Sequence, residues 1–86
     1  MYAAGLIADA LKGRSEAALA ADIGVSRMLL NEVKRERKPC PAWVAARLAE
    51  EAGRSPLIAA LECQRDTAKS VPERQTWERM IKWLRS

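Results

Sequence analysis

Apolar residues recur along the chain at the three-to-four-residue spacing of amphipathic helices, and short breaks divide them into successive runs. No stretch shows the alternation of apolar and polar positions that a β-strand needs. The pattern therefore predicts helices only. They cover residues 2–12, 15–23, 27–35 and 41–52, a fifth run that starts at 55, and residues 70–84.

Serine and glycine mark the ends of these helices. A serine side chain stabilises the first turn of a helix by accepting a backbone hydrogen bond, and glycine ends helices because it adopts the left-handed conformation without strain. Glu73 completes an S-x-x-E capping box, and Pro41 suits a first helical turn. The expected N-caps are Ser15, Ser26, Ser55 and Ser70, and the expected stops are Gly13, Gly24 and Gly53.

Composition supports one small, all-helical domain. The chain has 86 residues, sixteen of them alanine and four aromatic, and alanine both favours helix and allows helices to pack closely. We expect an all-α fold: a compact bundle of five short helices over residues 1–69, containing a helix-turn-helix, and a sixth, amphipathic helix over 70–86. The expected inward residues are Leu6, Ile7, Ala10, Leu11, Leu19, Ala20, Ile23, Leu29, Leu30, Val33, Val44, Ala45, Leu48 and Ala52.

The stretch from 17 to 33 places a glycine inside what otherwise reads as one helix. Glycine costs about 1 kcal/mol in a helix interior, which favours a turn at Gly24 between two helices. Ala20 allows these helices to approach each other closely, and Leu30 and Val33 anchor the second helix to the core. This spacing is typical of a helix-turn-helix, in which the helices cross at about 90–120°.

The helix predicted over 27–35 carries Arg27, Met28, Asn31 and Arg35 opposite its apolar side. In a DNA major groove, arginine binds guanine and asparagine binds adenine, each through two hydrogen bonds, and an apolar side chain contacts the thymine methyl group. This face indicates DNA recognition. An ordinary solvated helix surface is the alternative interpretation.

Positive charge concentrates in the same region. Residues 27–38 contain five basic and two acidic residues, a balance of +3 in a chain whose net charge is +4. Basic side chains bind DNA phosphates and so position a protein on the duplex, whereas a solubilising charged loop is the alternative. The expected phosphate-binding residues are Lys34, Arg35, Arg37 and Lys38.

The segment EAALAADIGVSRMLLNEVKRERK, residues 16–38, resembles the helix-turn-helix of the Cro and lambda-repressor-like transcriptional regulators of phages, prophages and bacterial chromosomes. The resemblance extends loosely over residues 1–66. It implies a five-helix domain that binds operator DNA as a homodimer. It also implies that the bases are read by Ser26, Arg27, Met28 and Asn31.

The chain departs from this family's pattern at two positions. Many members have a phosphate-binding glutamine where this chain has Glu16, whose carboxylate suits a helix N-terminus but repels a phosphate. Many also have glycine after the recognition helix, in the region where this chain has Glu36. We therefore expect the third helix to run longer.

The last predicted helix carries an apolar stripe at positions i, i+3, i+4 and i+7, with Trp83 beside it. Such a stripe packs either on the chain's own domain or on a second copy, and tryptophan is enriched in interfaces. Trp43 lies off the inward face of its helix and fits either the same interface or an edge of the core. The residues expected to mediate dimerisation are Leu57, Ile58, Leu61, Trp77, Met80, Ile81, Trp83 and Leu84.

Catalysis and metal binding have little support in the sequence. There is no histidine, no glycine-rich phosphate loop and no metal-ligand spacing, so we expect no enzyme activity, no cofactor and no metal. No segment reaches the about 20 apolar residues of a membrane span, and the N-terminal residues do not read as a signal peptide. We expect a cytoplasmic protein with Cys40 and Cys63 as free thiols.

These observations favour a sequence-specific, double-stranded-DNA-binding transcriptional regulator. The expected form is a Cro-like repressor that binds an inverted-repeat operator as a homodimer, with the third helix in the major groove. One alternative is the antitoxin of a toxin–antitoxin pair, whose C-terminal helix binds the toxin. Another is a helical protein-interaction module, an anti-repressor or adaptor, that does not bind DNA.

Overall fold

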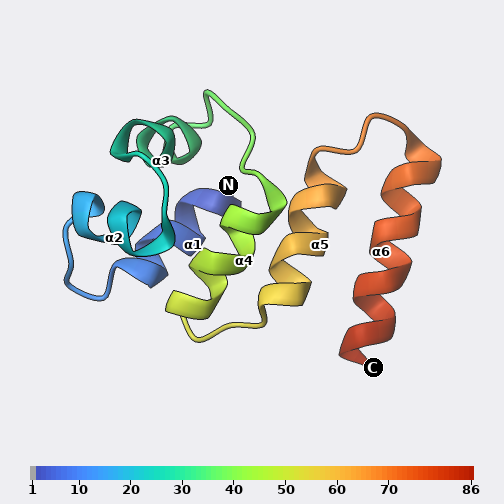
Figure 1. The fold of residues 1–86 in the computed structure, drawn as a ribbon. Coiled ribbons are helices and arrows are strands. Elements are labelled where there is room, and N and C mark those ends of the chain that lie inside the picture. The colour runs from blue at the N-terminus through green and yellow to red at the C-terminus, as the bar shows by residue number, and fades with distance from the viewer. Residues whose placement is uncertain (1) are drawn as a thin grey trace.

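The computed structural model describes the backbone of residues 2–86 and the side chains of residues 4–86. Within this range the chain forms six α-helices and no strand (Figure 1), which confirms the predicted all-helical class. No helix in it is both long enough and apolar enough to cross a membrane. The helices are α1 (Tyr2–Leu11), α2 (Glu16–Ile23), α3 (Arg27–Lys34), α4 (Ala42–Glu51), α5 (Pro56–Asp66) and α6 (Val71–Arg85).

Serine caps four of the six helices, as predicted. In each case the side-chain oxygen accepts a hydrogen bond from the backbone N–H three residues later, at 3.0–3.3 Å. Pro41 differs slightly from its prediction, because it occupies the N-cap position of α4 rather than the first turn. The four capping residues are Ser15, Ser26, Ser55 and Ser70.

The turn between α2 and α3 lies where the sequence predicts it. Gly24 adopts the left-handed conformation, with φ 86° and ψ 28°. Its N–H and that of Val25 both donate to the carbonyl of Ala20, at 2.9 and 3.0 Å. These bonds occupy the carbonyl at the end of α2 and direct the chain into Ser26, the cap of α3.

The prediction of a longer third helix is wrong. The helix ends at Lys34, and Glu36 takes the left-handed conformation with φ 63°. The N–H of Arg37 then donates to the carbonyl of Glu32 at 2.9 Å, so the backbone closes this helix end as it would with glycine. A left-handed conformation at a residue with a Cβ is tolerated here because local hydrogen bonds hold the turn.

The core lies among α1 to α5, with α4 at its centre. The helix α5 packs on α4 and contributes Ala59 and Cys63 to this core, whereas α6 packs on α5 and on no other helix of residues 2–86 (Figure 1). Most predicted inward positions are buried, while Leu11, Leu29 and Ala52 are half-buried. The buried core residues are Leu6, Ile7, Ala10, Leu19, Ala20, Ile23, Leu30, Val33, Val44, Ala45, Leu48, Ala49, Ala59 and Cys63.

Arg14 joins three helices at one edge of this core. Its guanidinium donates to the carbonyls of Ala10 and Leu11 at the end of α1, at 2.6 and 3.1 Å. It also pairs with Asp22 of α2 at 2.7 Å and with Glu51 of α4 at 2.9 Å. The hydrogen bond with Glu51 raises the pKa of Arg14 above its ordinary value, with a further contribution from Asp22. The Arg14 side chain therefore caps the end of α1 and links this helix to α2 and α4.

The turn at Gly24 is tested by two glycine-to-alanine substitutions that should change stability in opposite directions. A Cβ at Gly24 or at Gly5 meets no atom within 4 Å, but only Gly24 has a positive φ. Gly24→Ala should therefore lower the free energy of unfolding by about 1–2 kcal/mol. Gly5→Ala, inside α1, should raise it by about 0.5–1 kcal/mol. Urea unfolding followed by circular dichroism measures both, and equal effects of the two changes would contradict the turn.

Candidate nucleic-acid interface

The position of α3 is set by its buried side. Leu30 and Val33 are 1% and 2% exposed, and they pack into the core beside Ala20 of α2. The helix packs on α1 and α2, so its opposite side faces solvent. A short helix held along one side and open along the other is able to enter a groove without rearrangement of the fold.

The residues predicted to read bases lie on or beside this open side. Arg27 is exposed, Met28 is 72% exposed and Asn31 is half-buried. Within the described chain the side chains of Arg27 and Asn31 have no hydrogen bond or ion pair, so their donors are available to a ligand. Ser26 is also exposed, but its hydroxyl oxygen already accepts from the N–H of Leu29 at 3.0 Å. This hydroxyl therefore keeps its proton and one further lone pair for a ligand.

The four cations predicted to bind phosphate divide into two kinds. Lys34 is paired with Glu16 across the α2–α3 unit, at 2.5 Å between its Nζ and the carboxylate oxygen. Arg37 lies 4.0 Å from Glu32. The other two, Arg35 and Lys38, are exposed and have no ion-pair partner among residues 2–86.

The sequence analysis singled out Glu16 but did not predict its ion pair with Lys34. Its carboxylate lies at the first turn of α2, where the helix dipole favours negative charge, and it also neutralises Lys34. The two residues are eighteen positions apart. No local sequence signal indicates this pairing, which depends on how the turn folds α3 back on α2.

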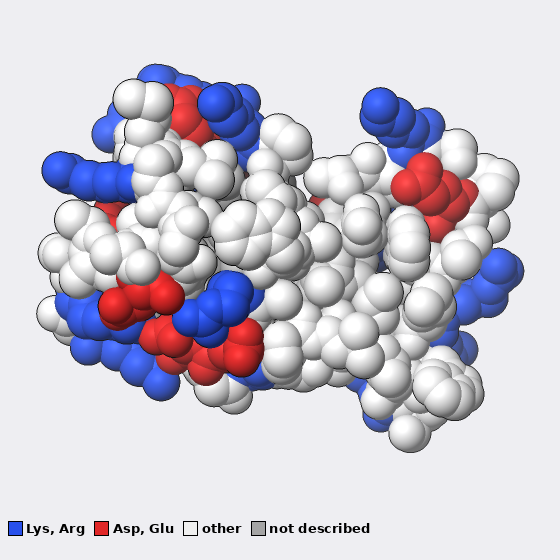
Figure 2. Space-filling model, viewed as in Figure 1, with Lys and Arg blue, Asp and Glu red and all other residues white. Residues whose placement is uncertain are grey.

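Figure 2 shows the distribution of charge on one face of the molecule. Lys and Arg side chains gather over α3 and the segment after it, with acidic side chains between them. A second charged region lies below, with Lys or Arg and Asp or Glu side chains side by side. Two other arginines of the described chain are paired with acids: Arg14 with Asp22 and Glu51, and Arg54 with Asp9. The centre of this face, over α4 and α5, is largely uncharged.

An apolar groove of about 480 Å³ runs between α5 and α6. Leu57, Met80 and Trp83 line it and are 56%, 43% and 77% exposed. Leu61 and Leu84 also line it, the first buried and the second half-buried. Of the other residues predicted to mediate dimerisation, Ile81 is buried, and Ile58 and Trp77 are half-buried. Thr76 and Arg79, which the sequence analysis did not single out, complete the lining. Trp43 is 55% exposed and does not line the groove.

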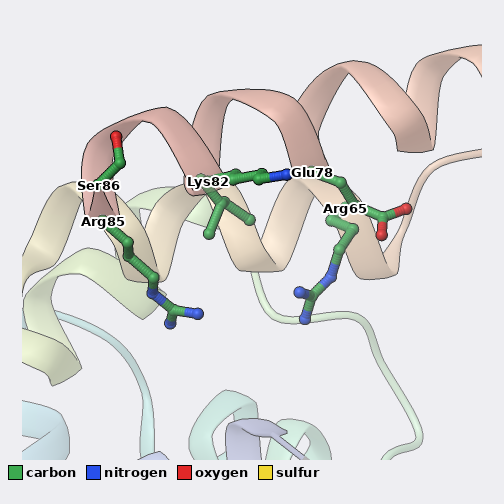
Figure 3. A pocket seen from close by; sticks show the side chains of 6 residues that line it. Arg65, Glu78, Lys82, Arg85 and Ser86 are labelled. Atoms are coloured by element: carbon green, nitrogen blue, oxygen red, sulfur yellow. The ribbon is translucent and has the colours of Figure 1, made fainter.

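The other side of the α5–α6 pair is polar (Figure 3). Arg65 and Arg85 extend to the same side there, and the Lys82 side chain runs along α6 toward Glu78. The two guanidinium groups already have partners, because Arg65 pairs with Asp66 at 3.1 Å and Arg85 with Glu62 at 3.2 Å. This cleft therefore resembles a solvated charged face more than a ligand site.

Comparison with protein-family models, with curated proteins and with solved structures found no match for the chain.

The pairing of Glu16 with Lys34 is measurable by a double-mutant cycle. Both side chains are partly exposed, so Glu16→Gln and Lys34→Met should each lower the free energy of unfolding by less than about 1 kcal/mol, with a coupling of about 0.2–1 kcal/mol. Lys38→Met, at a cation without a partner in the described chain, should show no coupling to Glu16→Gln. A coupling of zero for both lysines would show that the pair does not persist in solution.

Proposed function

We propose that the chain is a sequence-specific DNA-binding transcriptional regulator, a repressor of the Cro-like kind, which inserts α3 into the major groove. The observation that carries this proposal is the combination of a buried side and an unpartnered polar side on one short helix. Leu30 and Val33 hold α3 to the core, whereas Arg27 and Asn31 offer hydrogen-bond donors and Met28 an apolar contact.

The four cations differ in whether they already have an ion-pair partner, and this difference suggests which of them bind phosphate. Arg35 and Lys38 follow the exposed side of α3 and have no ion-pair partner within residues 2–86, so they approach phosphates without breaking an existing interaction. Lys34 must first leave Glu16. We therefore assign the main phosphate contacts to Arg35 and Lys38, and a weaker contribution to Lys34 and Arg37.

The groove between α5 and α6 supports the proposal of a homodimer. A tryptophan that is 77% exposed beside an exposed leucine and methionine is typical of an interface residue. Two copies joined through this groove would present two α3 helices. The corresponding operator is an inverted repeat with half-sites about 34–36 Å apart, or a multiple of that distance.

A helical protein-interaction module that does not bind DNA is the second candidate. The acidic residues Glu16 and Glu32 favour it, because both carboxylates lie close to the proposed phosphate-binding cations. An antitoxin is a variant of the first proposal, in which the α5–α6 groove takes a toxin instead of a second copy. Salt-dependent retention on DNA separates the first candidate from the second.

Selection of bound sequences from random double-stranded DNA should recover an inverted repeat. On that site Arg27→Ala should weaken the free energy of DNA binding by about 1–3 kcal/mol and relax the sequence preference at one base pair. Lys38→Ala should weaken binding on all sequences and reduce the slope of log affinity against log salt by about one.

Lys82→Ala is the matched control for these substitutions. It removes one positive charge from α6, where the lysine has no ion-pair partner in the described residues, and it should change neither affinity nor slope. Fluorescence anisotropy measures all three variants. Absence of any salt-dependent binding by the wild-type chain would remove the DNA-binding proposal and favour the interaction module.

Substitutions of two exposed tryptophans test the proposed dimer. Trp83→Ala should shift the chain from dimer to monomer in sedimentation equilibrium, because it removes the largest exposed apolar side chain of the groove. Trp43→Ala, on α4 and outside the groove, should leave the dimer intact. A wild-type chain that sediments as a monomer at all concentrations would contradict the assignment.

A further inference from the structure

Two cysteines from distant parts of the chain meet beside the segment that follows α3. Cys40 lies between Pro39 and Pro41, before α4, and is half-buried, whereas Cys63 lies on α5 and is 6% exposed. Both are free thiols. The interface proposed above uses neither residue.

The two residues are in direct contact. The thiol of Cys63 donates a hydrogen bond to the backbone carbonyl of Cys40. The thiol of Cys40 donates to the carbonyl of Pro41 at 3.5 Å. Both cysteines also line an opening of about 220 Å³, together with Gln64 and Thr67, so a small reagent has access to the pair.

The surroundings give the two thiols unlike acidities. The hydrogen bond with Cys63 and burial raise the pKa of Cys40. The side-chain interaction with Cys40 lowers the pKa of Cys63, whereas burial and the charge of Asp66 raise it. The pKa values of the two thiols are therefore shifted in opposite directions.

We propose that Cys40 and Cys63 form a dithiol oxidation site, at which a low-molecular-weight disulfide converts the pair into an intramolecular disulfide. The thiolate of one cysteine attacks one sulfur of the oxidant, forms a mixed disulfide and releases one thiolate, which takes up a proton. The other cysteine then loses its proton and attacks the protein sulfur of the mixed disulfide, which releases the second thiol. Two protein thiols are oxidised, and one molecule of oxidant is reduced to two thiols.

The resulting bond joins the segment between α3 and α4 to α5. In the structure as described, α3 and α5 make no close contact, and α4 lies between them in the chain. A cross-link from position 40 to position 63 closes a loop that contains all of α4, which restricts the unfolded chain and stabilises the fold. It also anchors the segment that carries Lys38, two residues before Cys40.

The test uses the reduced, folded full chain and oxidised glutathione, followed by intact mass spectrometry and peptide mapping. We expect the chain to lose two hydrogen atoms in mass, to retain no glutathione and to yield one peptide pair that joins positions 40 and 63. Its melting temperature should rise by about 5 °C or more, and dithiothreitol should reverse both changes. Two stable glutathione adducts on one chain, a bond between two chains, or no reaction would each overturn the proposal.

The single variants Cys40→Ser and Cys63→Ser provide the control. Each should accept at most one glutathione, and neither should gain thermal stability from the oxidant. Because Cys63 is buried, its variant could unfold, and the mapping of the wild-type chain then decides the question by itself. The experiment involves no DNA, so its outcome is independent of the proposed DNA binding.

Discussion

The burial of one side of α3 is the constraint on which the candidate interface depends. This helix has only eight residues, and Leu30 and Val33 are its two buried side chains. Together they fix its rotation about its own axis, because any other orientation would expose both to water at a cost of about 1.5–3 kcal/mol each. The left-handed turn at Gly24 brings the helix to this place. Arg27 and Met28 therefore face solvent because the packing of Leu30 and Val33 into the core fixes the orientation of the helix.

Ion pairing then determines which charges remain available. Away from α3, Arg14 is paired with the carboxylates of Asp22 and Glu51 and so links α1, α2 and α4. Around α3 the pairing is incomplete: Lys34 is paired with Glu16, but Arg35 has no ion-pair partner in residues 2–86. The net charge of +4 does not tell which cations are paired and which are free to bind a ligand. The ion pairs of the folded chain do, because an unpaired surface cation binds an anion without first losing a salt bridge.

The C-terminal helix α6 packs on one neighbour only, α5, within residues 2–86. Each of α5 and α6 packs on the helix before it, and Ile81 is the one buried side chain of α6. A helix with a single neighbour leaves apolar surface uncovered, here at Met80 and Trp83. The same arrangement gives α5 two distinct functions in the fold: it supports α6 on one side, and on the α4 side it brings Cys63 against Cys40.

Local patterns in the sequence determined the helices, their serine caps, the turn at Gly24 and most of the buried positions, because these features depend on residues within one or two helical turns of one another. The same periodicity separated Arg27 from Leu30. Only the tertiary structure decided the pairing of Lys34 with Glu16, the meeting of Cys40 with Cys63 and the exposure of Trp83. Contacts between residues so far apart depend on how whole helices pack, which no local spacing specifies. The end of α3 belongs to the second group as well, since hydrogen bonds of the folded turn hold a glutamate in a conformation that its sequence alone does not favour.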